Sequence, residues 1–189
     1  MTTIVHQWSG PRSLSTAMMY SFAQRPDCQV EDEPLYAHHL RTFASLHRPY
    51  RAQLLEAFPE NGNDALRRVY AKQQKPLLFI KNIAKQCTDC ITTSILIGSH
   101  IKHVILIRDP VEIISGWGNQ SAFHQEVINN DITNLPKLVN IFSTVRAATG
   151  MAPIVINVSM LHTHPKLILQ ALCAALEIPF YEEQLTWPV

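Results

Sequence analysis

Residues 9–16, with the sequence SGPRSLST, bring a cation and several hydroxyl groups to a place where they can hold an anion. They lie between a short apolar run and a helical pattern. A turn that leads into a helix presents free backbone N–H groups and the positive end of the helix dipole, so it can bind a phosphate or a sulfate. Arg12 adds a permanent charge, and Ser13, Ser15 and Thr16 add hydroxyls. The alternative is a helix N-cap with incidental serines.

The same segment lacks the features of a nucleotide-triphosphatase loop. Such a loop reads GxxxxGK[ST], in which the Lys and the hydroxyl residue serve a magnesium triphosphate. Residues 9–16 contain neither the second glycine nor the Lys-Ser/Thr pair. An ATP-dependent phosphotransferase is therefore the less favoured class.

A second segment, residues 107–117, places Arg108 after an apolar run and directly before the start of a helix. Asp109 has the residue type of an N-cap, and Pro110 is typical of a first helical position. A cation at the end of a buried strand needs a counter-charge. Arg108 either pairs with Asp109 or binds a second anion, helped by a hydroxyl group of the following helix.

Short β-rich runs alternate with helical patterns along the chain. This order indicates right-handed crossovers and a mainly parallel sheet with helices on both faces. Strands are expected at residues 4–8, 29–31, 77–81, 103–107 and 154–158, and helices at 15–24, 51–74 with a break at 59–63, 88–97, from 110, 136–148 and 165–176. Residues 119–134 are polar and irregular, which is typical of a loop over a site.

The expected strand ends bring polar residues to one edge of the sheet. In folds of this kind, ligands bind beyond the carboxyl ends of the strands. These ends carry residues 10–16, Glu33, Lys81, Arg108 and Ser159. Cations, a carboxylate and hydroxyls should therefore converge there.

Together these segments resemble the sulfotransferase superfamily, whose members use the sulfate donor PAPS (3′-phosphoadenosine 5′-phosphosulfate). A bacterial and plant sulfotransferase-like branch is the most similar, on residues 8–19, 24–27, 32–38, 79–84 and 173–180. The resemblance implies a three-layer, P-loop-like α/β fold with a mainly parallel sheet of about five strands flanked by helices. It also implies a single domain over residues 1–189.

The resemblance assigns roles to two groups of residues. The loop that holds the 5′-phosphosulfate of the donor is matched by Arg12, Ser13, Leu14, Ser15 and Thr16. Arg108 matches the arginine that binds the 3′-phosphate, the group that distinguishes PAPS from ordinary adenine nucleotides.

The chain departs from the family pattern in three places. A serine is usual about eight residues after that arginine, where this chain has Gly116; Ser115 stands one residue earlier, which is about 100° around a helix. The histidine common after the third strand is absent, and Asn82, Lys85 and Gln86 occupy that neighbourhood. Relatives usually have more sequence after the last helix than this chain has. The two alternatives are a complete short form and a truncated one.

Sulfuryl transfer needs a base for the acceptor's proton and cations for the bridging oxygen. Glu33 is the expected base because it follows the second strand and because some bacterial relatives use a carboxylate; its alternative role is a helix cap or a salt bridge. His38 and His39 are the alternative bases, and surface or capping roles are the more common for them. Lys81 is expected to neutralise the leaving oxygen.

Composition excludes several classes of partner. Sixteen Lys and Arg against fifteen Asp and Glu give a net charge of +1, which makes no broad surface for nucleic acid or an anionic membrane. No apolar run approaches the roughly 18 residues of a membrane span, and the N-terminus does not read as a signal peptide, so the cytoplasm is expected. The single pair Cys87 and Cys90 predicts no metal site.

The sequence thus favours an enzyme that transfers a sulfuryl group from PAPS to a hydroxyl or amine of a small molecule. A non-catalytic nucleotide-binding module is the alternative, because of Gly116 and the short C-terminus. The oligomeric state is left open.

Overall fold

The computed structural model describes residues 2–43, 48–58, 60–89, 91–118 and 133–186. Within these ranges five strands form one sheet in the order β2-β3-β1-β4-β5, and every neighbouring pair is parallel. The strands are β1 (Thr3–Ser9), β2 (Cys28–Asp32), β3 (Leu77–Ile83), β4 (Ile101–Ile107) and β5 (Ile154–Asn157). The predicted α/β class and the number of strands are confirmed.

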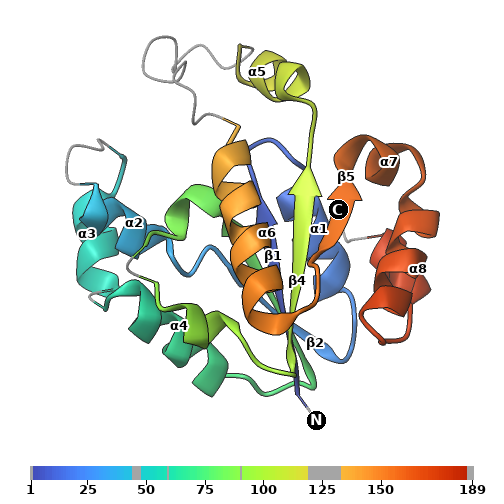
Figure 1. The fold of residues 1–189 in the computed structure, drawn as a ribbon, viewed down its shortest axis with the longest axis horizontal. Helices are drawn as coiled ribbons and strands as arrows, with labels where there is room; N and C mark the ends of the chain where they lie inside the picture. Colours follow the sequence, from blue (N-terminus) through green and yellow to red (C-terminus); the bar gives the residue numbers. More distant parts are fainter. Residues whose placement is uncertain (1, 44–47, 59, 90, 119–132, 187–189) are drawn as a thin grey trace.

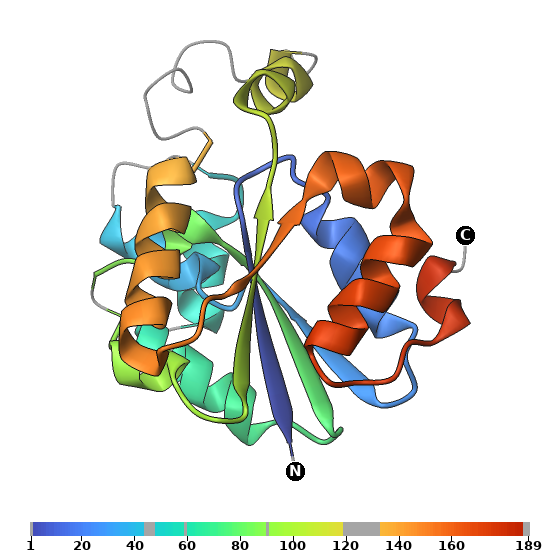
Figure 2. The ribbon, with the colours of Figure 1, turned by 45° about the vertical axis from the view of Figure 1, so that its right-hand side comes forward.

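Helices cover both faces of the sheet, so that the molecule has three layers (Figures 1 and 2). The described α-helices are α1 (Ser15–Ala23), α2 (Tyr36–Thr42), α3 (Arg51–Ala57), α4 (Gly62–Ala71), α5 (Pro110–Gly118), α6 (Leu135–Thr149), α7 (Val158–Thr163) and α8 (Pro165–Ala175). Figure 2 shows α1, α7 and α8 on one face and α4 and α6 on the other. Helix α5 lies beyond the carboxyl end of β4 (Figure 1).

Alternation along the strands explains the two cores. Successive strand residues point to opposite faces, and β1 sends Val5 to the face of α1 while Trp8 packs on the face of α6. Trp8, Met18 and Phe22 are buried, as their spacing predicts. Because apolar side chains fill both faces, polar residues that stand at the carboxyl ends are held on a rigid frame.

One predicted helix does not form, and the fifth strand, although confirmed, is one residue shorter than predicted. The helix expected at residues 88–97 is replaced by short 3₁₀ turns, Ala84–Gln86 and Thr93–Leu96. The strand expected to continue to residue 158 ends at Asn157, whose side-chain oxygen accepts from Ser159 N at 2.8 Å and caps α7. Most of the predicted loop at 119–134, namely residues 119–132, lies outside the described residues.

Candidate active site

The turn between β1 and α1 has the form of an anion cradle. Arg12 and Leu14 both adopt left-handed backbone conformations, with φ of 56° and 54°. Leu14 is the N-cap residue of α1. Among the described residues no side chain caps this helix end, and the first turn of α1 contains no acidic residue. Because the first N–H groups of a helix lack partners within the helix, this end can bind an anion.

The hydroxyl groups of the cradle differ in their environment. Ser13 is buried, and its Oγ donates to Pro11 O at 3.1 Å. Ser15 is buried as well, whereas Thr16 is exposed. The N-cap position of α1 is taken by Leu14 rather than by a serine.

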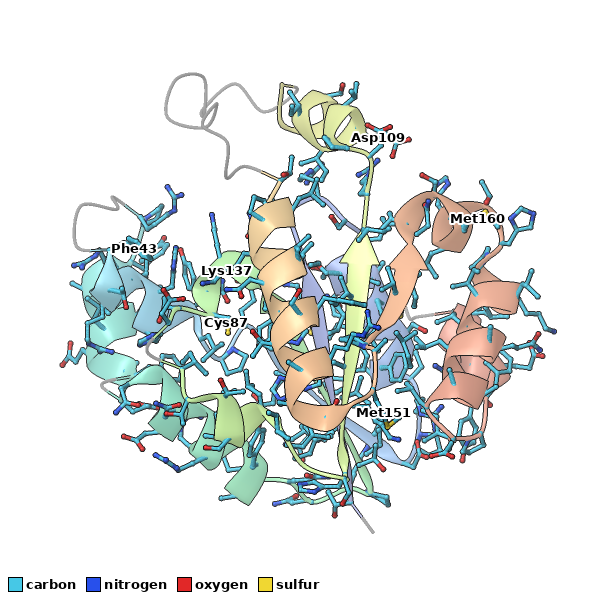
Figure 3. The ribbon with its side chains drawn as sticks, viewed as in Figure 1. Phe43, Cys87, Asp109, Lys137, Met151 and Met160 are labelled. Carbon is cyan, nitrogen blue, oxygen red and sulfur yellow. The ribbon has the colours of Figure 1, made fainter. Side chains whose placement is uncertain are left out.

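Arg108 follows β4 directly and does not pair with Asp109. Its Nε donates to Glu112 Oε2 at 2.9 Å, and its Nη1 donates to Arg12 O at 2.5 Å. Asp109 Oδ1 instead accepts from Val111 N at 2.7 Å, which confirms it as a cap of α5 (Asp109 is labelled in Figure 3). The Arg108 side chain therefore ties the cradle to the first turn of α5, and it is partly exposed rather than buried.

The predicted helper of Arg108 on α5 is engaged elsewhere. Ser115 Oγ donates to Val111 O of its own helix at 2.8 Å. Gly116, at the position where the resemblance predicts a serine, lies beside Arg12: a Cβ there would stand 3.6 Å from Arg12 Nε. A Cβ at this position would therefore make only ordinary van der Waals contact with the Arg12 side chain.

Glu33 and Lys81 lie together at the other end of the rim. Lys81 is 4% exposed, and its Nζ donates to Glu33 Oε1 at 2.6 Å and to Asp32 Oδ1 at 2.7 Å. Burial lowers the pKa of Lys81, but the hydrogen bonds and charges of both carboxylates outweigh it and leave the pKa above its ordinary value. Lys81 is therefore a permanent cation here.

Both carboxylate oxygens of Glu33 are engaged, because Gln86 Nε2 donates to Oε2 at 2.6 Å. The backbone of Glu33 is left-handed, with φ of 48°, and its N–H donates to Lys81 O at 2.9 Å. The salt bridge that the sequence offered as an alternative role is thus present. Asp32 and Gln86 share this cluster, and their spacing in the sequence does not predict it.

A further polar residue lies in the centre of the sheet. Gln7 is 0% exposed, and neither its Nε2 nor its Oε1 has a partner among the described residues. The strand register pairs Gln7 with Lys81, so both side chains belong to the same face. A glutamine in a strand whose residues are nearly all buried is the signal by which the sequence indicates it.

His38 and His39 are buried rather than on the surface, which corrects the expectation for them. His38 Nε2 bonds to Thr88 Oγ1 at 2.8 Å, and burial, with the charge of Arg41, lowers its pKa. Burial, helped by the charge of Lys85 and others, lowers the pKa of His39 to about 4. Both rings are therefore neutral at pH 7.

Two cavities adjoin the rim on opposite sides. One, of about 330 Å³, has mainly apolar walls from α1, α7, α8 and the segment of Gln184, and it includes Leu14 of the cradle. The other, of about 400 Å³, is lined by Glu33, Tyr36 and Phe58 among others. The first cavity thus includes a cradle residue, and the second lies beside the end of β2.

The described ranges contain no group of three His, Cys, Asp or Glu side chains that could hold a metal ion. Cys87 is buried, and Cys90 lies outside those ranges. No helix in them is long and apolar enough to cross a membrane.

A family model described as a sulfotransferase domain matches residues 2–189. Branched-chain-amino-acid aminotransferase-like protein 2 of Arabidopsis thaliana is 37% identical over 187 residues, which are 97% of this chain and 32% of that protein. The chain therefore spans about a third of the length of the curated relatives that it matches.

Solved structures agree on the fold. A sulfotransferase from Alicyclobacillus acidocaldarius has a TM-score of 0.65 at 11% identity, with 100% of this chain and 87% of that one covered. A shikimate kinase from Bacteroides thetaiotaomicron has a TM-score of 0.51 at 14% identity, with 93% and 99% covered. The kinase likeness confirms the P-loop-like arrangement of strands and helices.

Proposed function

Since the chain belongs to the sulfotransferase domain family, we propose that it transfers a sulfuryl group from PAPS to a hydroxyl or an amine of a small molecule. The observation that carries this proposal is the order of groups along the rim. The cradle lies at the central strand β1, Arg108 follows β4 on one side, and Lys81 with Glu33 stands at β3 and β2 on the other.

Donor and acceptor then occupy opposite sides of the cradle. The uncapped end of α1 suits a 5′-phosphosulfate, and Arg108 suits a 3′-phosphate on the side of β4. The apolar cavity that includes Leu14 lies on the face of α1 and is suited to an adenine ring. The acceptor then occupies the cavity beside Glu33. The wall of this cavity contains Tyr36 and Phe58.

Glu33 and Lys81 divide the chemistry of the transfer. The acceptor oxygen or nitrogen forms a bond to sulfur, its proton passes to the Glu33 carboxylate, and the bond between sulfur and the donor's bridging oxygen breaks. Lys81 supplies positive charge for the oxygen that leaves. Each Glu33 oxygen accepts one hydrogen bond, from Lys81 or from Gln86, and keeps a second lone pair that can take the proton.

A non-catalytic nucleotide-binding module is the second candidate, and it has its own support. The serine that the resemblance predicts on α5 is Gly116, and the Ser115 hydroxyl is bonded to its own helix. A module would keep the cradle and Arg108 without turnover. It would bind the donor but transfer nothing to any acceptor.

Calorimetric titration with PAP, the desulfated donor, against AMP and against ATP with magnesium tests the donor. We expect PAP to bind more tightly than either, because only PAP carries a 3′-phosphate. Tighter binding of ATP with magnesium would contradict the proposal. An assay of sulfuryl transfer across alcohols, phenols and amines then separates enzyme from module.

A further inference from the structure

The cavity beside Glu33 has three consecutive acidic residues in its wall. Its volume is about 400 Å³, and Glu31, Asp32 and Glu33 all line it. They lie at the end of β2, which is an edge strand of the sheet. Asp32 and Glu33 share the single ammonium group of Lys81. These two carboxylates therefore already exceed their cation by one negative charge.

Glu31 adds a third carboxylate, and among the described residues it has no cationic partner. Its Oε1 accepts from Gln29 Nε2 at 3.4 Å, which is a long hydrogen bond from a neutral amide. The Glu31 residue is half-buried, so its charge is only partly hydrated. A carboxylate in this position favours a cation that enters the cavity from solution.

The positive side chains around the cavity are committed to other partners. Arg68 lines the cavity, its Nε donates to Glu60 Oε1 at 2.5 Å, and its guanidinium lies 5.4 Å from the ring centroid of Phe58. Arg41 donates to the backbone carbonyls of residues 55, 58 and 60. With Lys81 these arginines make three cations, and they stand against four carboxylates, namely Glu31, Asp32, Glu33 and Glu60. The cavity and the groups bonded to its wall therefore keep one negative charge in excess.

The rest of the wall is aromatic or apolar. Tyr36, Leu54 and Phe58 line the cavity, and Phe58 is 41% exposed. Aromatic faces attract cations, as the position of Arg68 over Phe58 illustrates. A molecule with an apolar body and an ammonium group matches both parts of this wall, whereas an anionic molecule would meet the unpaired carboxylate.

We propose that the acceptor is an amino alcohol or an aminophenol, whose ammonium group is bound by Glu31 and whose hydroxyl lies toward Glu33. A protonated amine has no lone pair with which to attack sulfur, so the hydroxyl is the group that receives the sulfuryl. The ammonium group serves recognition alone. This inference rests on the proposed function, and it names the chemical class of the acceptor.

The test compares acceptors of similar size that differ in charge. Tyramine and 4-amino-1-butanol are cations at pH 7.5, and 4-ethylphenol and 1-pentanol are their neutral counterparts. The rate of PAP release with saturating PAPS gives kcat/KM, and calorimetric titration of the PAP complex gives affinity without turnover. The cationic member of at least one pair should exceed its neutral counterpart about tenfold in both measurements, the scale of a hydrogen bond to a charged group.

Two variants assign this preference to the wall of the cavity. Glu31→Gln keeps the shape of the side chain and should lower the tyramine to 4-ethylphenol ratio of kcat/KM about tenfold. Phe58→Leu keeps an apolar wall without a ring and should lower the ratio about threefold. Glu183→Gln is the matched control, because Glu183 is an exposed carboxylate of the turn Glu182–Leu185, and it should leave the ratio unchanged. Thermal unfolding should show that all variants fold.

The outcomes separate this inference from the proposed function. If neither cationic probe binds the PAP complex or reacts better than its neutral counterpart, the inference is overturned, and transfer to the neutral alcohols or phenols would leave the proposed function intact. A preference for tyramine that persists in Glu31→Gln would also overturn it, because the ammonium would then bind elsewhere. If the wild type does not bind PAP, it is the proposed donor that fails.

Discussion

Replacing Arg25 by alanine should lower the free energy of unfolding by more than a substitution on the surface does, because Arg25 holds the C-terminal part of the chain in place. The Arg25 side chain is 0% exposed. Its Nε and Nη2 donate to the two carboxylate oxygens of Asp27 at 3.0 and 2.9 Å. Its Nη1 donates to Pro179 O at 2.6 Å and to Gln184 Oε1 at 3.0 Å. One side chain therefore joins the end of α1 to the segment that follows α8.

The magnitude follows from the burial of the pair. Removing one partner of a buried ion pair costs about 3–5 kcal/mol. Because the Asp27 side chain is 27% exposed, the remaining carboxylate is partly hydrated, and we expect the lower end, about 3 kcal/mol. For a chain of this size that corresponds to a fall in Tm of roughly 6–12 °C. Arg67→Ala breaks an ion pair whose arginine is 64% exposed and should cost less than about 1 kcal/mol.

Urea unfolding followed by tryptophan fluorescence measures both variants. Gln184 also lines the apolar cavity that includes Leu14, so Arg25→Ala should weaken PAP binding although it does not touch the proposed donor site. A loss of stability equal to that of Arg67→Ala would refute the reasoning, because it would mean that the buried network contributes no more than an exposed pair.

Three further perturbations test the site and the fold. Glu33→Gln should abolish transfer and change PAP affinity less than about twofold, whereas Glu56→Gln on α3 should leave both unchanged; a surviving rate would move the base elsewhere. Burial keeps the pKa of His39 at about 4, below the 6.5 of an unfolded chain, so the unfolded state binds the extra proton and the free energy of unfolding should fall as pH drops from 6.5 to 4. His39→Leu should flatten this dependence in urea titrations at several pH values, and an unchanged slope would assign it to other histidines such as the buried His6. The two carboxylates raise the pKa of Lys81 above its ordinary 10.5, so its ion pairs stabilise the fold fully below pH 10.5. The free energy of unfolding should fall as the pH rises through the raised pKa. Lys81→Met should remove this fall in stability at alkaline pH.

The sequence predicts the start of an element well where neighbouring residues determine the local structure. Asp109 before Pro110 predicts the start of α5, and the Asp109 side chain caps it. The same observation argues against one of the two alternatives for Arg108, the ion pair with Asp109, because a carboxylate that accepts from the helix backbone is turned away from the preceding arginine. Glu112, one turn into the helix, takes that role, and a four-residue spacing is the signal that predicts such a pair.

Prediction fails where distant contacts outweigh local preference. The helix expected at residues 88–97 does not form, and the N–H of Thr92 donates to Asn63 Oδ1 at 2.8 Å, a contact 29 residues away in sequence. The Glu33 cluster is similar, because Lys81 and Gln86 lie about 50 residues from Glu33 along the chain. The rim could be predicted from strand ends, but its pairing depends on strand order, which periodicity does not encode.

The central position of β1 has a consequence for how the chain acquires its structure. In the described part of the chain β1 pairs with β3 and β4 alone, and its first residue in the register, Thr3, faces Leu77. During synthesis at about 5–20 residues per second, β1 waits several seconds for its first partner. Contacts of such long sequence separation also slow folding itself. Within this domain, β1 is therefore the strand that stays unpaired longest while the rest of the sheet is synthesised.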